Sequence, residues 1–234
     1  MTRPACERED MGRRRGPMRV KAVTQLVRRD APCPPDEVCQ WSGLAQRIAD
    51  DRATLCRMAA DRSFERRPVT LSSGRQSGYY VDGKQVTLWP TGALLLARII
   101  LKAVQDQPVD AIGGLTIGAD PIVGGVVVLS ALEGRPIPGF LVRKEPKRHG
   151  KMALIEGELK SEWRVLIVDD VITTGASILK TIHAVEEYGV RVVGVFALTD
   201  REEGGRAMLE SRGYPTFAVC TASELAEAKQ CRQP

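Results

Sequence analysis

The sequence contains no apolar run long enough to cross a membrane. No window of the 234 residues approaches the roughly 18 apolar residues of a membrane-spanning helix. The N-terminal segment also lacks the apolar region of a secretory signal peptide. The six cysteines are scattered, without the C-x-x-C spacing of a zinc site or the tight spacing of a disulfide framework. We therefore expect a cytoplasmic protein with reduced thiols and no membrane partner.

A strong excess of one charge is also lacking. The formal net charge is +5, and residues 1–40 hold nine of the 34 basic and six of the 29 acidic residues. The remaining chain, with 25 basic and 23 acidic residues, is nearly neutral. Bulk charge thus gives no reason to expect a nucleic-acid partner, and any anion site must come from a local cluster.

Residues 1–40 differ from the rest of the chain in composition. They are rich in arginine and proline and follow no sustained period, which predicts a flexible leader. A nucleic-acid-binding arm is an alternative for this segment, and Met18 is an alternative start. Residues 41–234 are long enough for one α/β domain with its own core. We expect a hood over about residues 42–86 and a core over residues 90–222.

Alternating patterns predict an α/β fold. Ser42 is placed to cap a first helix, and turn signals up to residue 86 indicate short hood strands. In the core we expect strands at 111–115, 139–142, 164–168, 190–198 and 216–219, and helices at 90–104, 120–133, 175–188 and 202–212. Residues 144–160 have no clean period. This alternation predicts a parallel sheet with helices on both faces.

Residues 165–177, VLIVDDVITTGAS, form the most informative segment. An apolar run predicts a central strand that ends in Asp169 and Asp170. The following turn leads into a helix, whose first N–H groups and nearby hydroxyls suit an anion. Two carboxylates repel a phosphate but suit sugar hydroxyls or Mg²⁺. The pattern favours a sugar phosphate over the alternative, a solvated acidic pair before an ordinary helix cap.

A second cluster occupies residues 143–150, RKEPKRHG. Five potential cations and one carboxylate lie within seven residues, and Pro146 excludes a regular helix. Charge alone leaves two interpretations open, a solvated loop and a mobile flap that meets a pyrophosphate.

Residues 165–177 resemble the motif with which type I phosphoribosyltransferases bind phosphoribosyl pyrophosphate (PRPP). The resemblance implies a type I phosphoribosyltransferase-like fold, a parallel sheet with helices on both faces and a small hood. It also implies that the acidic pair holds the ribose hydroxyls and that the turn binds the 5′-phosphate. The PRPP-binding residues implied are Asp169, Asp170, Val171, Ile172, Thr173, Thr174, Gly175, Ala176 and Ser177.

Residues 143–150 are similar to the catalytic loop of orotate phosphoribosyltransferases. The resemblance implies that the pyrophosphate is bound by Arg143, Lys144, Lys147 and His149. It further implies four catalytic residues, namely Lys147, His149, Asp169 and Asp170. Lys147 and His149 would stabilise charge on the departing pyrophosphate. In that family the loop reaches the neighbouring subunit, which implies a homodimer with shared active sites.

Three further segments agree with this family: residues 71–80, 114–121 and 199–205. The last matches its D-R-x-x-G-G element, so Thr173 and Arg201 are the orotate-binding residues implied. A guanidinium group suits a planar carboxylate. The alternative for Arg201 is a surface ion pair with Glu202 or Glu203. Some members carry Lys at the position of Ser72, which this chain lacks.

The resemblance covers about residues 45–222 and implies a pentosyltransferase. The implied reaction converts orotate and PRPP to orotidine 5′-monophosphate and pyrophosphate in de novo pyrimidine (UMP) biosynthesis. Mg²⁺ would be the cofactor, held mainly through PRPP, with no certain protein metal ligand. Two alternatives remain, a phosphoribosyltransferase for another base and a PRPP-binding transcriptional regulator.

Overall fold

A six-stranded sheet lies at the centre of the chain, with the strand order β10-β9-β8-β5-β6-β7. The structure is a computed structural model that describes residues 44–70, 76–145 and 154–231. The strands are β5 (Ala111–Leu115), β6 (Gly139–Val142), β7 (Ile155–Gly157), β8 (Arg164–Ile172), β9 (Arg191–Asp200) and β10 (Thr216–Thr221). All neighbours pair in parallel except β7, which is antiparallel to β6.

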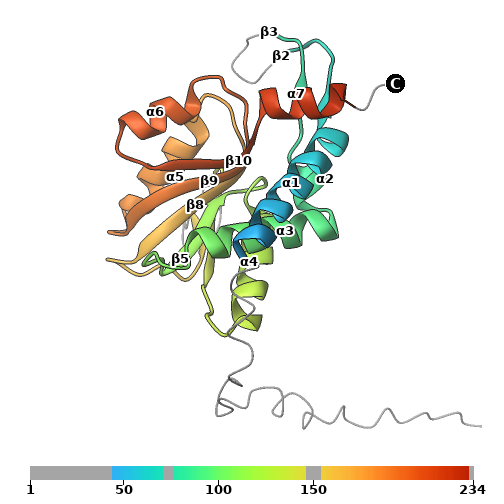
Figure 1. The fold of residues 1–234 in the computed structure, drawn as a ribbon. Coiled ribbons are helices and arrows are strands. Elements are labelled where there is room, and N and C mark those ends of the chain that lie inside the picture. Colours follow the sequence, from blue (N-terminus) through green and yellow to red (C-terminus); the bar gives the residue numbers. More distant parts are fainter. Residues whose placement is uncertain (1–43, 71–75, 146–153, 232–234) are drawn as a thin grey trace, which may run out of the picture. The chain divides into compact units, whose positions relative to one another are not determined.

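Helices cover both faces of this sheet, as predicted (Figure 1). One face packs against α1 (Leu44–Arg62), α3 (Pro90–Ala103), α4 (Asp120–Leu132) and α7 (Ala222–Gln230). The other packs against α5 (Ala176–Glu186) and α6 (Gly205–Ser211). Successive residues of β8 enter opposite cores, Leu166 and Val168 on one side and Val165 and Ile167 on the other. Burial on both sides explains the continuous apolar run in the sequence.

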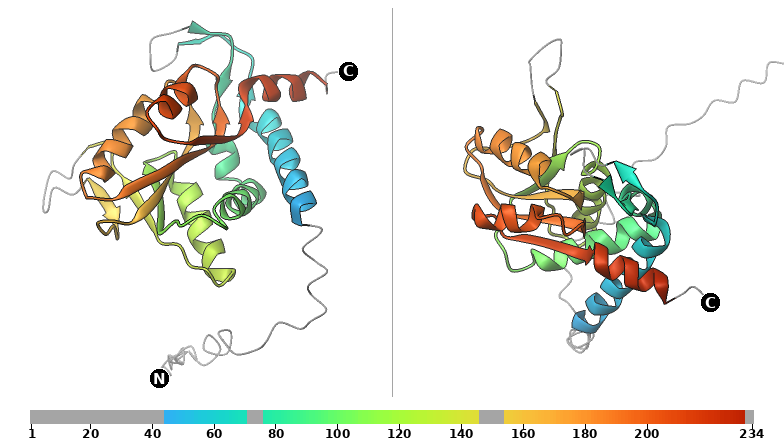
Figure 2. Two further views of the ribbon diagram at one scale, coloured as in Figure 1. Left: turned by 60° about the vertical axis from the view of Figure 1, so that its left-hand side comes forward. Right: turned by 90° about the horizontal axis from the view of Figure 1, so that it is seen from above.

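The hood consists of short strands and one short helix. The strand β1 (Phe64–Glu65) pairs with β4 (Tyr80–Val81), and β2 (Val69–Thr70) pairs with β3 (Gln76–Ser77). The helix α2 (Lys84–Thr87) follows, where the sequence had predicted strand up to residue 86. Two views in Figure 2 show the hood strands at one edge of the molecule, near α7.

Several element bounds differ from the prediction for physical reasons. The strands β5 and β6 begin and end where the sequence places them. The strand β8 continues past Val168 to Ile172, because its pairing with β9 extends to that residue. The strand β7 and the helix α7 were not predicted. β7 has three residues and depends on pairing with β6, whereas α7 is short and weakly apolar.

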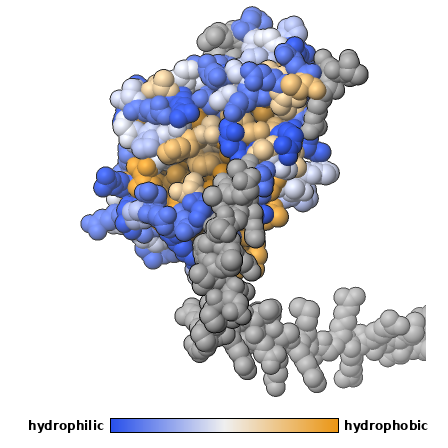
Figure 3. Space-filling view, viewed as in Figure 1, coloured by the Kyte–Doolittle hydropathy of each residue, from blue (hydrophilic) through white to orange (hydrophobic). Residues whose placement is uncertain are grey.

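The connections after β5 and after β8 run to opposite faces of the sheet. The chain leaves β5 for α4 on one face and leaves β8 for α5 on the other. Ligands of open α/β sheets bind at such a reversal, beyond the carboxyl ends of the strands. None of the helices in the described ranges has the length and apolar character to cross a bilayer. Figure 3 shows one face, with apolar surface in its middle and polar surface around it.

Candidate functional site

The predicted acidic pair lies near the carboxyl end of β8, where the connections diverge to opposite faces of the sheet. Asp169 and Asp170 are largely buried, with 9% and 8% of their surface exposed. The backbone N–H of Asp170 donates to Asp169 Oδ1 at 2.9 Å. Burial and then the neighbouring charge of Asp170 raise the pKa of Asp169 to about 8. Burial beside a second carboxylate therefore favours the neutral form of Asp169.

A lysine that the sequence analysis did not single out pairs with this site. Lys84 Nζ lies 3.3 Å from Asp170 Oδ2 and 2.8 Å from Asp82 Oδ1. Partial burial opposes ionisation of Lys84, but the two carboxylates outweigh it and raise its pKa. The sequence had indicated only a turn at Asp82 and Gly83. Because Lys84 offsets the charge of the pair, the carboxylates repel a nearby phosphate less than two isolated charges would.

The loop after β5 packs directly against the acidic pair. A Cβ atom on Gly118 would overlap the Oδ1 atoms of both Asp169 and Asp170. Gly83, before α2, also lies against Asp170, with its ideal Cβ 2.8 Å from the Cβ of that residue. Glycine at these two positions allows two backbone segments to approach the carboxylates.

The predicted phosphate-binding turn follows β8 and opens α5. Gly175 has a φ of +75°, in the left-handed region that favours glycine. Gly205 N donates to Thr173 O at 3.0 Å, so the start of α6 supports the turn. Thr174, Ala176 and Ser177 are exposed, and the first N–H groups of α5 have no partner within the helix. This arrangement offers hydroxyl and amide donors to an anion.

Val171 and Ile172, also predicted to bind PRPP, belong to the strand β8, as the acidic pair does, and not to the turn. Ile172 is fully buried among the apolar side chains under α5, and Val171 is half-buried. Their apolar side chains offer no hydrogen bond to a ligand.

The start of the predicted cationic flap lies at the end of β6. Arg143 Nη1 is 3.2 Å from Glu156 Oε1 on β7. Lys147 and His149 lie outside the described residues. A cavity of about 610 Å³ connects this segment with the loop after β5, and its lining includes Thr116, Arg143 and Lys144. The described part of the flap and the β5 loop therefore face the same space.

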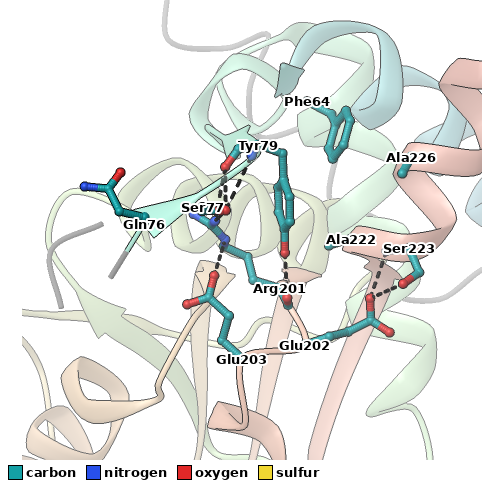
Figure 4. A pocket seen from close by; sticks show the side chains of 10 residues that line it. All are labelled: Phe64, Gln76, Ser77, Tyr79, Arg201, Glu202, Glu203, Ala222, Ser223 and Ala226. Atoms are coloured by element: carbon teal, nitrogen blue, oxygen red, sulfur yellow. Dashed lines mark hydrogen bonds and ion pairs between the residues drawn. The ribbon is translucent and has the colours of Figure 1, made fainter. Parts of the chain in front are cut away.

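The arginine predicted to bind orotate lies at the end of β9, in the wall of a second cavity (Figure 4). Arg201 is 4% exposed and adjoins a cavity of about 330 Å³ between the hood and α7. Its Nη2 donates to Ser77 Oγ at 3.1 Å and to Tyr79 O at 3.3 Å. The Tyr79 ring lies 4.8 Å from the guanidinium carbon.

An ion pair of Arg201, which the sequence had left as an alternative at the surface, lies in the interior. Arg201 Nε is 2.9 Å from Glu203 Oε1, and both side chains are buried. Glu202 instead accepts hydrogen bonds from the backbone and side chain of Ser223, at the start of α7. Arg201 N also donates to Ile172 O at 2.9 Å. That bond joins the arginine site to the turn that begins at Thr173.

Known proteins match this chain over most of its length. Residues 90–212 match the phosphoribosyl transferase domain family. The orotate phosphoribosyltransferase of Aquifex aeolicus (strain VF5) is 46% identical over 178 residues, which are 75% of this chain and 97% of that protein.

Solved structures agree with the sequence matches. The Mycobacterium tuberculosis H37Rv orotate phosphoribosyltransferase in complex with Fe(III) dicitrate is 39% identical, with a TM-score of 0.66. That match covers 75% of this chain and 98% of the other. The same enzyme in complex with PRPP is 38% identical, with a TM-score of 0.63, over 75% of this chain and 99% of the other. The chain therefore belongs to the type I phosphoribosyltransferase family, among the orotate phosphoribosyltransferases.

Proposed function

We propose that the domain of residues 41–234 transfers the phosphoribosyl group of PRPP to orotate, in de novo pyrimidine (UMP) biosynthesis. The products are orotidine 5′-monophosphate and pyrophosphate. One observation carries the proposal: an exposed donor turn beside a buried acidic pair ends β8, and a buried arginine ends the neighbouring β9. The turn and the pair suit a sugar phosphate, and the arginine suits a planar carboxylate.

The parts of PRPP and orotate are assigned to different elements. The turn of residues 173–177 binds the 5′-phosphate, and Asp169 and Asp170 accept hydrogen bonds from the ribose hydroxyls. Arg201 and Thr173 bind the orotate. Arg143 and Lys144 face the pyrophosphate together with the flap residues Lys147 and His149.

The reaction needs no covalent intermediate with the protein. The bond between C1 of the ribose and the pyrophosphate oxygen breaks, and its electron pair leaves with the pyrophosphate. A ring nitrogen of orotate donates a pair to C1 from the opposite face, and the proton of that N–H group leaves to water. The protein contributes by holding the two reactants in line and by stabilising charge on the departing pyrophosphate with Lys147 and His149.

The proposed Mg²⁺ fits a site formed mainly by the substrate. The described residues contain no cluster of three or more His, Cys, Asp or Glu side chains that could hold a metal ion. Mg²⁺ is commonly held by one or two carboxylates together with substrate phosphates and water. Asp169 and Asp170 would be the carboxylates that contribute to holding it. When bound, the ion would neutralise charge on the pyrophosphate.

A homodimer in the cytoplasm, in which the flap of each subunit completes the partner's site, belongs to the same proposal. Exposed apolar side chains on two packed helices, Leu94 on α3 and Val128 and Leu132 on α4, support self-association. The test mixes two inactive variants, Lys147→Ala and Arg201→Gln, in equal amounts. Shared sites would restore about a quarter of the wild-type activity after subunit exchange, and sites formed within one subunit would restore none.

The decisive experiment measures orotate consumption by absorbance, with and without PRPP and Mg²⁺. We expect consumption only when PRPP is present, with pyrophosphate released in equal amount. Uracil and adenine serve as alternative bases in the same assay. Turnover of one of these in place of orotate, or DNA binding without any pyrophosphate release, would overturn the proposal.

A further inference from the structure

The ion pair between Arg201 and Glu203 is unusual because both groups are inside the protein. Their side chains are 3% and 8% exposed, and Nε lies 2.9 Å from Oε1. The contact is not a well-aligned hydrogen bond, since Arg201 Nε and Glu203 Oε2 are both buried without a hydrogen-bond partner among the described residues. A buried pair with unmet hydrogen bonds contributes little to stability. The arrangement therefore needs another explanation.

The donors of the Arg201 guanidinium are divided among three directions. A guanidinium has five N–H groups. Those of Nη2 point to the hood, toward Ser77 Oγ and Tyr79 O, and that of Nε faces Glu203. In the parts of the chain that the structure describes, no residue accepts a hydrogen bond from Nη1. The pair lines the cavity of about 330 Å³, as Figure 4 shows.

Backbone geometry explains why Glu203, and not Glu202, takes this place. Glu202 has a φ of 58°, so the chain turns between the two residues. The Glu202 carboxylate points outward to Ser223 Oγ at 2.6 Å, and the Glu203 carboxylate points inward to Arg201. The backbone conformation thus sets the inward direction of the Glu203 side chain.

We propose that Glu203 is a positioning residue that holds the Arg201 guanidinium with its Nη1 edge toward the base. This inference rests on the proposed function, because it takes Arg201 as the residue that binds the carboxylate of orotate. Glu203 occupies the Nε side, so an incoming carboxylate meets the remaining edge in one orientation.

The test is Glu203→Gln, which keeps the size of the side chain and removes its charge. Contacts to the base exist in both the ground state and the transition state, so their loss appears in KM and not in kcat. We expect the KM for orotate to rise about tenfold, with kcat and the KM for PRPP changed less than about twofold. The matched control is Glu210→Gln, which removes an exposed ion pair with Arg206 on α6 and should change none of these values.

Two results would overturn the inference. One is an unchanged KM for orotate in Glu203→Gln, and the other is an equal rise in the KM values for orotate and PRPP, as a general distortion of the folded site would give. If Glu203→Gln does not fold, Glu203→Asp replaces it, and an unchanged ratio of the two KM values has the same meaning. A wild-type protein that does not consume orotate would overturn the proposed function instead, before either variant is compared.

Discussion

Replacing Asp169 with Asn should stabilise the ligand-free protein, and the gain should grow as the pH rises. Burial, together with the charge of Asp170, raises the pKa of Asp169 to about 8 in the folded chain. The unfolded chain should have a value of about 3.9. Between these two pH values the folded protein holds a proton that the unfolded chain has released. Stability associated with this group is therefore lost as the pH rises through that window.

The pH dependence of the free energy of unfolding follows from a difference of one bound proton between the folded and unfolded chains. With one more proton bound in the folded state, the free energy of unfolding falls by about 1.4 kcal/mol for each pH unit. Asn does not titrate, and its oxygen is still able to accept the 2.9 Å hydrogen bond from Asp170 N. The stability difference between the variant and the wild type should thus increase by about 3 kcal/mol between about pH 5 and about pH 7.

Urea unfolding at several pH values measures this difference directly. The matched control is Asp110→Asn, one residue before β5. Hydrogen bonds from Arg164, one of 2.8 Å to Oδ2, lower the pKa of Asp110. Asp110 is thus ionised in both folded and unfolded chains above about pH 5. The difference in free energy of unfolding between Asp110→Asn and the wild type should therefore not vary with pH above that value. A constant difference for Asp169→Asn over the same range would refute the reasoning, whatever its absolute size.

The other predictions concern binding and turnover. Arg201→Gln should lower kcat/KM for orotate about a hundredfold, because a charged hydrogen bond to the base is lost. Steady-state rates equal to those of the wild type would contradict the role of Arg201 in orotate binding. Gly118→Ala should lower kcat/KM for PRPP about tenfold or more, because its methyl group overlaps the acidic pair. The control is Gly124→Ala, because a Cβ atom at that position would meet no neighbouring atom. This variant should keep full activity, and its free energy of unfolding should be about 0.5–1 kcal/mol higher. Lys84→Met removes the cation beside Asp170 and should raise the KM for PRPP about tenfold in titrations with PRPP, so that an unchanged KM would count against this role.

The parts of the fold that the sequence predicted well depend on contiguous patterns. The strand β5 is a buried apolar run, and its bounds agree with the prediction. The helix α7 shows a pattern that was available but not used. Thr221 and Glu224 form a reciprocal capping box, which marks a helix start without an apolar stripe. The strand β7 had no such marker, because it exists through its pairing with β6.

In the candidate site, too, the residues that the sequence predicted are contiguous, and those that it missed are distant along the chain. Asp169, Asp170 and the turn after them are adjacent in the sequence, so one segment predicted their placement together. Lys84 lies 86 residues before Asp170 and reaches it because Gly83, at the start of α2, packs against that residue. No local pattern indicates that contact. The sequence likewise offers Glu202 and Glu203 as equal partners of Arg201. Only the positive φ of Glu202 decides between them.

The two ends of the proposed reaction are held by separate pieces of backbone. The sugar-phosphate half belongs to β8 and the turn after it, while the base half, apart from Thr173 of that turn, belongs to the end of β9 and to hood residues such as Ser77. Evolution or an engineer could therefore exchange the acceptor that this scaffold uses by altering the second set alone. The residues that bind the sugar phosphate would stay the same in each such enzyme.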